Sequence, residues 1–414
     1  MSDISADWVL PVDGPPLRNG RVAWEDGRIV EVGPGRSERH LEGAAILPGL
    51  VNAHSHLEYA AYAGFGDGLD FRRWLALHIE RKARLGIPEM EAVARLGAAE
   101  CLASGITTVG DASYSGAAVT ACAELGLRAI VYIEVFGPGT EQLTTRFAAH
   151  RARIAGDLSE RVQLGISPHS PYTAPLELWQ AAVELGLPVA THLAETEAEA
   201  DWSQSGRGPL EGVRPTSIRE LAGAGLLSAR MAAAHCVHLD AEERDLLARY
   251  DVAVVHCPRS NALLACGIAP LSELRAAGLR VGIGTDSPAS TPSFDLFEEL
   301  RTAIYLARAR ERRPEALTAD EALRLATIDG ARALGLDQEI GTLTPGKRAD
   351  LTVLSFAGSP YDPIEDPATA AVFGGSPARV LETIVDGTTR YRQGDAWHEV
   401  RSTASAARGR MLAQ

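Results

Sequence analysis

Short apolar runs alternate with longer amphipathic segments in the middle of the chain, from about residue 48 to about residue 338. The longer segments, such as EAVARLGAAECLASG and LDAEERDLLARY, space their apolar residues at about 3.6, which predicts helices. The short runs predict buried strands. We count eight of them, which are ILPGLVNAHSH, ITTVGDA, RAIVYIEVF, VQLGISPHS, PVATHLAE, MAAAHCVH, VAVVHCP and VGIGTDS.

The two ends of the chain have a different pattern. The first end contains WVLPVDG and GRVAWEDGRIVEVGPG, in which an EDG turn separates two alternating apolar runs, as in a hairpin. The other end repeats this style in GTLTPGKRADLTVLSF and ARVLETIVDGTTRYRQGDAWHEV. Eight strand–helix units predict a TIM (β/α)8 barrel over residues 48–338. Residues 1–47 and 339–414 are expected to form one small β-sandwich, the second segment ending in a tail.

Composition and charge restrict the partners of this protein. Hydrophobic residues make up 46% of the 414 residues and charged residues 23%, as in ordinary globular proteins. The net charge of -14 disfavours nucleic acids and anionic membranes as partners. The five cysteines include no C-x-x-C pair, and no signal sequence or stretch of about 18 apolar residues is present. We therefore expect a cytoplasmic protein that acts on a small molecule.

Several polar residues stand at the ends of predicted strands, where a barrel builds its active site. His54 and His56 alternate along the first strand, so both rings point to one face. His192 ends the fifth strand and Asp286 ends the eighth, so closure of the barrel brings them to the same point. Three imidazoles and one carboxylate form a ligand set that suits Zn(II) or Fe(II).

The remaining histidines divide by position. His235 also ends a predicted strand and joins the candidate site. A lone histidine elsewhere is more often a satisfied polar group than a ligand. We interpret as structural or solvated the four that fall in helix, turn or rim contexts, which are His78, His150, His238 and His398.

Six motifs follow one another along the chain: PGLVNAHSHLE, SPHSPY, THLAETE, AHCVHL, HCPRSNALLACGIAPL and GIGTDSPAS. Together they resemble the amidohydrolase superfamily, in its cytosine deaminase and chlorohydrolase-like branch, from about residue 5 to about residue 395. The resemblance implies a metal-bearing barrel with a β-sandwich made by both termini, which the strand pattern predicts independently. It also implies an enzyme that hydrolyses C–N bonds of cyclic amidines.

The lysines bear on the number of metal ions. Many binuclear members of the superfamily bridge two metals with a carbamylated lysine on strand four. Strand four is here VQLGISPHS, and the two lysines of the chain, Lys82 and Lys347, lie outside the predicted strands. We expect one divalent ion, Zn(II) before Fe(II), which lowers the pKa of a bound water toward about 7.

The resemblance also implies catalytic roles. Asp286 is then both ligand and base, His235 hydrogen-bonds the attacking hydroxide, and Glu195 protonates the ring nitrogen and the leaving amine. General acid–base catalysis of this kind is worth about 10² to 10⁴ in rate. Glu195 has an alternative role as a first-turn carboxylate of the helix that follows it.

Three residues are candidates for substrate binding, each with an alternative. Glu80 lies in a predicted lid helix, FRRWLALHIERKARL, and its alternative is an exposed i,i+4 partner of Arg84. His169 matches a substrate-contacting histidine of similar deaminases, and its alternative is a polar plug of the barrel. Arg259 suits a carboxylate such as a benzoate. Its alternative is a structural salt bridge in a loop.

The choice of substrate rests on local resemblances. Similar S-adenosylhomocysteine deaminases carry arginines after strand three, whereas this chain reads YIEVFGPGTEQL there. HSHLEY, DFRRWL and IEVFG look closer to aminodeoxyfutalosine deaminases of menaquinone biosynthesis, which makes that 6-aminopurine nucleoside our first hypothesis. Alternatives are deamination of S-adenosylhomocysteine, methylthioadenosine, adenosine or guanine, and hydrolysis of a chlorotriazine or a cyclic amide. A non-catalytic assembly barrel is a remote alternative, and a homodimer is one candidate assembly.

Overall fold

The computed structural model describes residues 1–413, and a parallel barrel forms its centre. Eight strands pair with their neighbours in chain order, every pair parallel. They are β5 (Leu50–Ser55), β6 (Ile106–Ser113), β7 (Arg128–Val135), β8 (Val162–Pro168), β9 (Val189–Leu193), β10 (Met231–His235), β11 (Ala253–His256) and β12 (Val281–Ile283). Each of the eight predicted strands is present, so the predicted barrel is confirmed.

The barrel closes between its first and last strands. Ser55, at the end of β5, forms a parallel bridge with Asp286, just after β12. The backbone N–H of Asp286 donates to the carbonyl of His54 at 3.0 Å. Asp286 has a positive φ of 58°, which is uncommon for a residue other than glycine and concentrates at functional sites. The seam of the barrel therefore sets two candidate metal ligands side by side.

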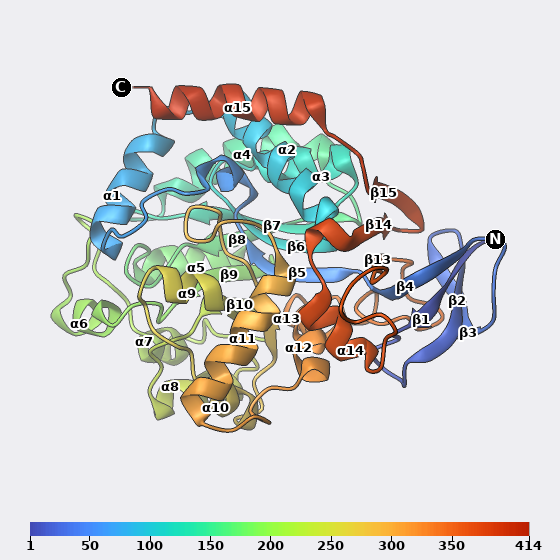
Figure 1. The fold of residues 1–414 in the computed structure, drawn as a ribbon. Helices are drawn as coiled ribbons and strands as arrows, with labels where there is room; N and C mark the ends of the chain where they lie inside the picture. The colour runs from blue at the N-terminus through green and yellow to red at the C-terminus, as the bar shows by residue number, and fades with distance from the viewer. Residues whose placement is uncertain (414) are drawn as a thin grey trace.

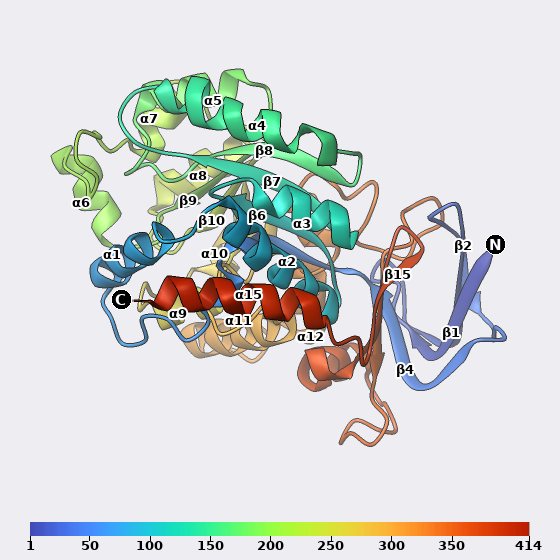
Figure 2. The same cartoon turned by 90° about the horizontal axis from the view of Figure 1, so that it is seen from above.

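Helices surround the barrel in both views (Figures 1 and 2). Their apolar faces pack on the strands, as in α5, where Leu178, Trp179 and Ala182 are buried. The helices of this layer are α1 (Phe71–Lys82), α2 (Ile87–Ala103), α3 (Ala117–Leu125), α4 (Ala148–Ile154), α5 (Leu176–Glu184), α6 (Ala198–Ser205), α7 (Ile218–Gly223), α8 (Ala241–Arg249), α9 (Pro258–Leu263), α10 (Leu271–Ala276), α11 (Leu296–Glu311), α12 (Ala319–Leu325) and α13 (Ile328–Ala333).

The two ends of the chain meet in a second sheet beside the barrel (Figure 1, right). Its order is β15-β14-β13-β4-β1-β2-β3, so the expected small domain is one continuous seven-stranded sheet. Asp26 and Gly27 turn between β2 and β3 with positive φ, as a two-residue hairpin turn requires. The strands are β1 (Ser2–Val9), β2 (Leu17–Glu25), β3 (Arg28–Pro34), β4 (His40–Pro48), β13 (Leu351–Ser355), β14 (Val380–Val385) and β15 (Thr388–Arg392).

Two helices follow the strands of the C-terminal half of this sheet: α14 (Pro367–Thr369) between β13 and β14, and α15 (His398–Leu412) after β15. The segment expected as a tail is therefore a helix, and it lies over α2 of the barrel (Figures 1 and 2). Ala404, Ala407 and Met411 are its buried residues, at the spacing of one helix face. Arg84, two residues past α1, donates to the carbonyl of Met411 at 3.1 Å.

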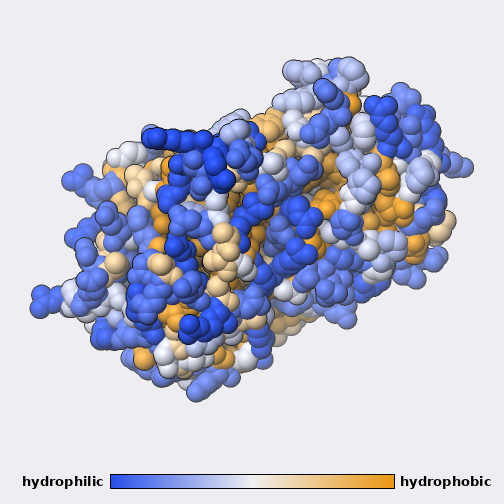
Figure 3. Space-filling model, turned by 90° about the horizontal axis from the view of Figure 1, so that it is seen from below, coloured by the Kyte–Doolittle hydropathy of each residue, from blue (hydrophilic) through white to orange (hydrophobic). Residues whose placement is uncertain are grey.

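Hydrophilic residues cover much of one face of the molecule (Figure 3). On the face shown in Figure 3, hydrophilic residues predominate and apolar residues show mainly in the furrows between them. Within residues 1–413, no helix combines the length and hydropathy that crossing a membrane requires. The homodimer stays a prediction.

Candidate active site

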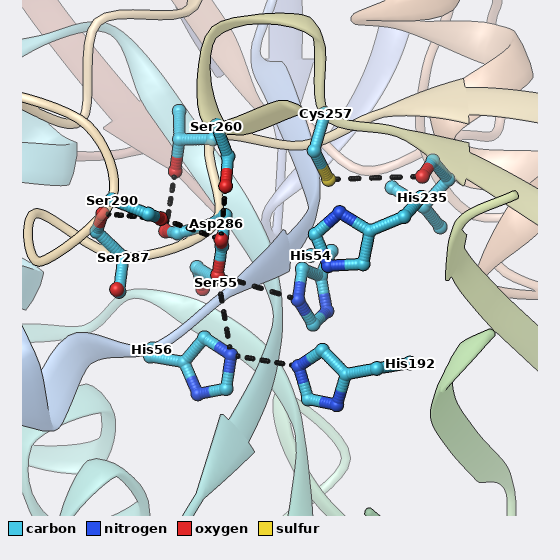
Figure 4. A network of polar contacts seen from close by, with 12 residues as sticks. His54, Ser55, His56, His192, His235, Cys257, Ser260, Asp286, Ser287 and Ser290 are labelled. Carbon is cyan, nitrogen blue, oxygen red and sulfur yellow. Dashed lines mark hydrogen bonds and ion pairs between the residues drawn. The ribbon is translucent and has the colours of Figure 1, made fainter. Parts of the chain in front are cut away.

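The four predicted ligands converge inside the barrel at the ends of β5, β9 and β12 (Figure 4). The Nε2 atoms of His56 and His192 lie 3.2 Å apart, and Oδ1 of Asp286 lies 3.3 Å from Nε2 of His56. Nε2 of His54 is 3.7 Å from the same oxygen and is buried without a hydrogen-bond partner. Tetrahedral ligands about 2.1 Å from a zinc ion stand about 3.4 Å from one another. The spacing and the orphaned nitrogen therefore fit a metal ion.

Hydrogen bonds to neighbouring groups orient two of these ligands, His192 and Asp286. The Nδ1 of His192 pairs with the carbonyl of His169 at 2.8 Å, which directs Nε2 toward the cluster. Oδ2 of Asp286 accepts from the hydroxyls of Ser260 and Ser290, both at 2.6 Å (Figure 4). The other carboxylate oxygen of Asp286 is thereby left to face the histidines.

Burial sets the protonation states of the cluster. It lowers the pKa of His54 to about 3 and is the largest cause of the lowered pKa of His56. Burial opposes ionisation of Asp286, but its interactions with the imidazole of His54 and with the other histidines of the site hold its pKa well below the usual range. Neutral imidazoles beside an ionised carboxylate are the states that bind a divalent ion.

Glu195 and His235 lie next to this cluster. Oε1 of Glu195 is 3.9 Å from Nε2 of His235, whose Nδ1 pairs with Oδ1 of Asn261 at 2.9 Å. Glu195 is 5% exposed, and burial raises its pKa to about 7. A carboxyl with such a pKa can hold and release a proton at neutral pH. His235 has a positive φ of 73°, a second strained backbone at the site.

Glu199 occupies the capping role that was the alternative for Glu195. Its carboxylate accepts from the backbone N–H of Ala194 at 2.9 Å, of Glu195 at 2.8 Å and of Thr196 at 3.0 Å. Among residues 1–413 the carboxylate of Glu195 accepts from no backbone N–H. Glu199 therefore holds the turn, and the side chain of Glu195 is left to face the cavity.

A cavity opens beside the cluster. Helix α1, which the sequence predicts as a lid, forms one wall of this cavity. The N-terminus of α1 is capped by Asp70, whose side chain accepts from the N–H of Arg73. The indole N–H of Trp74 donates to the carbonyl of Ala289 at 3.0 Å and joins the helix to the loop after β12. One face of α1 lines the cavity, with Phe71, Trp74, Leu75, His78, Ile79 and Lys82. The helix thus contributes a stripe of side chains at helical spacing.

His78 is structural or solvated in our interpretation of the sequence, and the structure gives it buried packing contacts in the cavity wall. It is 6% exposed and lines the cavity, where its ring stacks on Trp74 with ring centres 5.4 Å apart and lies 4.5 Å from that of Tyr59. The burial excludes the solvated alternative and agrees with the structural one, and α1 also turns this face toward the cavity. Its i+4 spacing from Trp74 in a predicted lid is the signal that could have found it.

Two charged residues in the cavity wall have no counterpart in the sequence prediction. Glu134 on β7 is 2% exposed, and its Oε1 is buried without a hydrogen-bond partner. Lys82 ends α1 and lines the same cavity. His169 also lines it, with Nδ1 3.0 Å from the hydroxyl of Thr173 and Nε2 4.0 Å from Glu134. The candidate His169 is thus at the cavity, as a substrate contact requires.

The other two substrate candidates lie outside the cavity lining. Glu80 is on the outer face of α1 and pairs with Arg84 at 2.5 Å, which is its alternative role. Arg259 donates through Nε to Glu299 at 2.5 Å and through Nη1 to Glu298 at 2.8 Å. It is 5% exposed, so these ion pairs occupy its guanidinium. The structure therefore favours the alternative role of each residue, an exposed ion pair for Glu80 and a structural salt bridge for Arg259.

The segment after the third barrel strand does supply an arginine. Arg146, in the π-helical turn Leu143–Phe147, lies just beyond the stretch in which the sequence shows none. Its guanidinium carbon is 3.8 Å from the ring centre of Tyr114 and 5.0 Å from that of Phe136, which lines the cavity. The sequence observation stands, because YIEVFGPGTEQL contains no arginine; Arg146 follows three residues later and is not among the cavity-lining residues.

Known proteins resemble this chain over nearly all of its length. The model of the amidohydrolase family matches residues 45–390. A 5'-deoxyadenosine deaminase of Methanothermobacter thermautotrophicus is 35% identical over 400 residues, which cover 93% of this chain and 92% of that protein. A 5-methylthioadenosine/S-adenosylhomocysteine deaminase of Symbiobacterium thermophilum is 35% identical over 417 residues, covering 94% and 93%. The zinc-bound structure of an adenosine deaminase from Xanthomonas campestris superposes with a TM-score of 0.89 at 30% identity, covering 99% of this chain and 98% of that one.

Proposed function

Because the chain belongs to the amidohydrolase family, we propose that it is a metal-dependent deaminase that converts a 6-aminopurine nucleoside to the 6-oxo product and ammonia. The observation that carries the proposal is the position of Glu195, a buried carboxyl with a pKa of about 7 beside the metal-binding cluster. A proton donor at this place suits an amidine, whose ring nitrogen and leaving amine both need protons. The relatives named for deamination of adenosine analogues support the same reaction.

We propose that the site binds one divalent ion, with Zn(II) as the first choice and Fe(II) as the second. The four predicted ligands, His54, His56, His192 and Asp286, would hold it. A second group of possible ligands, Glu134 with His169 and His192, shares His192 with the first, and β8 carries no lysine to bridge two ions. Bound there, a divalent ion supplies Lewis acidity and makes water a nucleophile at neutral pH.

Side chains of the barrel perform the proton transfers. Asp286 accepts the proton that the attacking water loses, at Oδ1, because Oδ2 already accepts from Ser260 and Ser290. His235 orients the nucleophile through Nε2, because Asn261 holds its Nδ1. Glu195 gives a proton to the ring nitrogen, takes one from the C6 hydroxyl as that group becomes the carbonyl, and passes it to the departing amine. The proton held by Asp286 then restores Glu195 for the next turnover. The purine lies in the inner part of the cavity, with its sugar toward His169.

We infer that aminodeoxyfutalosine is the substrate, which would place the enzyme in menaquinone biosynthesis. The local resemblance of HSHLEY, DFRRWL and IEVFG to deaminases of that compound supports this choice. The cavity, with Tyr59, Trp74 and Phe136 in its walls, supplies aromatic surface for a nucleoside with an aromatic substituent. S-adenosylhomocysteine, methylthioadenosine and adenosine are the alternatives within the same reaction.

The test is a substrate panel with zinc-loaded protein. The panel contains adenosine, 5'-deoxyadenosine, methylthioadenosine, S-adenosylhomocysteine, aminodeoxyfutalosine, guanine, cytosine and a chlorotriazine. Ammonia and chloride release are measured together with the change in ultraviolet absorbance. Ammonia from at least one 6-aminopurine nucleoside is the expected result. Chloride release without ammonia would favour a chlorohydrolase, and no turnover of any nucleoside would overturn the proposal.

A further inference from the structure

The outer part of the cavity contains a lysine whose ammonium group has no polar partner. Lys82 lines the cavity from the end of α1, and within residues 1–413 it makes no hydrogen bond and no ion pair within 4.0 Å. Its Nζ lies 4.0 Å from the ring centre of Tyr114 and 5.9 Å from that of Phe136. Aromatic faces attract a cation but satisfy none of its three N–H donors. The ammonium is therefore available to a ligand.

Burial lowers the pKa of Lys82; the carboxylates of Glu134 and Glu58 oppose this shift and the guanidinium of Arg146 adds to it. Glu58 is 1% exposed and already accepts from Ser113, Ser115 and the backbone N–H of Ala117. The guanidinium of Arg146 covers Tyr114 and donates to its carbonyl. Glu134 also lines the cavity and has no hydrogen bond of its own among the described residues. Lys82 and Arg146 therefore supply two positive charges in this region. Of the two carboxylates, Glu58 is already hydrogen-bonded, and Glu134 is available to a ligand.

Glu134 and Lys82 differ in burial, since Glu134 is 2% exposed whereas Lys82 is partly exposed at the end of α1. Glu134 is 4.0 Å from His169, which in turn contacts the metal ligand His192 through its carbonyl. Lys82 lies at the C-terminal end of α1, among Tyr59, Tyr114 and Phe136. A nucleoside whose amine reaches Glu195 would pass its sugar by Glu134 and point its far substituent toward Lys82. The carboxylate of Glu134 accepts from hydroxyl groups, and the ammonium of Lys82 attracts a negative charge.

We propose that Lys82 is the specificity-determining residue of this enzyme and binds a carboxylate on the 5' substituent of the nucleoside, while Glu134 accepts from the sugar hydroxyls. The proposal rests on the proposed deaminase function and narrows its substrate class to nucleosides with an anionic 5' substituent. It also assigns to Lys82 the carboxylate recognition that the sequence had suggested for Arg259. Arg146 adds positive charge behind Tyr114 without lining the cavity.

A purely structural role for Lys82 makes different predictions. A lysine that only attracts Glu134 and holds α1 against the barrel would affect every substrate alike. Its replacement would then lower the melting temperature or the rate for all nucleosides without changing their ratio. The decisive quantity is therefore the preference between two ligands that differ only in charge.

Such a pair is 5'-deoxy-5'-(2-carboxyethylthio)adenosine and its primary amide. We expect the wild-type enzyme to favour the acid in kcat/KM, and Lys82→Met to reduce the acid-to-amide ratio by about tenfold or more. The rate with the amide should change by less than about threefold, because the amide makes no ion pair. Lys82→Arg should keep most of the preference, and raising the salt concentration should weaken it.

Lys347→Met is the matched control, because Lys347 is the other lysine of the chain and donates to the carbonyl of Ile340, outside the cavity lining. It should leave the ratio unchanged. Lys82→Gln replaces Lys82→Met if the latter does not melt cooperatively. An equal rate with acid and amide in the wild type, or a preference that survives Lys82→Met, would overturn the role of Lys82.

Failure of the proposed function gives a different result. If the wild type deaminates neither compound nor 5'-deoxyadenosine, the deaminase proposal fails. Calorimetric Kd values of the acid and the amide, for the wild type and Lys82→Met, then test the carboxylate site without turnover. Tighter binding of the acid that is lost in Lys82→Met supports the site, and equal binding of the two compounds overturns it.

Discussion

The two ends of the cavity differ in how their polar groups are held. At the inner end, His192 is oriented by a backbone carbonyl, His235 by Asn261 and Asp286 by two serine hydroxyls. At the outer end, Lys82 and Glu134 have no hydrogen bond among the described residues. The chemistry is therefore preorganised by the protein, whereas the outer groups remain available to a ligand. Reaction type and substrate choice should respond to different mutations.

Asp286→Ala should have the largest effect, because it removes both a metal ligand and the proposed base. We expect kcat/KM to fall by at least about a thousandfold. Zinc content, measured by mass spectrometry after dialysis, should fall with it. Asp245→Ala changes an exposed aspartate of α8 and serves as the control. Full activity of a folded Asp286→Ala protein would exclude the proposed site, whereas absence of turnover in both the wild type and the variant would fit a non-catalytic barrel.

Glu195→Gln tests the proton donor while leaving the four metal ligands in place. A loss of about 10² to 10⁴ in kcat is expected, with zinc content unchanged. In the wild type, Glu195 must be protonated to act as an acid, so kcat/KM should decrease as the pH rises above about 7. Glu184→Gln, an exposed glutamate at the end of α5, is the control. A deaminase whose kcat is unaffected by Glu195→Gln must use another acid.

Glu199→Ala should have a smaller effect, since Glu199 acts through the turn that carries Glu195. The substitution leaves three backbone N–H groups without their acceptor. We expect kcat to fall by about tenfold with little change in KM, and Glu199→Gln to recover part of the loss through its amide oxygen. The neighbouring exposed Glu197→Ala should resemble the wild type. An equal loss in Glu199→Gln and Glu199→Ala would argue for a role of the charge instead.

Glu80→Ala should have the smallest effect. The side chain is 59% exposed, and its i,i+4 pair with Arg84 is worth about 0.3–0.5 kcal/mol. Both kcat/KM and the melting temperature should therefore stay close to the wild-type values. A clear rise in KM for nucleosides would mean that α1 rotates when substrate binds and brings Glu80 into the cavity.

The inner end of the cavity was predictable because it depends on local features. Strand periodicity and the position of polar residues at strand ends were sufficient to select His54, His56, His192 and Asp286, which the structure brings together. Glu195 and His235 follow the same strand-end rule. The outer end depends on which face of α1 turns inward, and sequence spacing alone allows either face of an amphipathic lid to carry the contacts. The resemblance to adenosine-type deaminases selects Glu80, which pairs with Arg84 on the outer face, whereas Lys82 lines the cavity.

Repeating patterns and motifs at strand ends are enough to predict the barrel, the meeting of both termini in a small sheet, and the ligand set. Within residues 1–413, it is the folded structure that pairs Arg259 with Glu298 and Glu299, uses Glu199 to hold the turn of Glu195, and leaves Lys82 without a hydrogen bond or ion pair. These facts concern pairs of residues whose partners are set by packing between separate elements. The position of Lys82 in the cavity wall depends on this packing and cannot be predicted from a local sequence pattern.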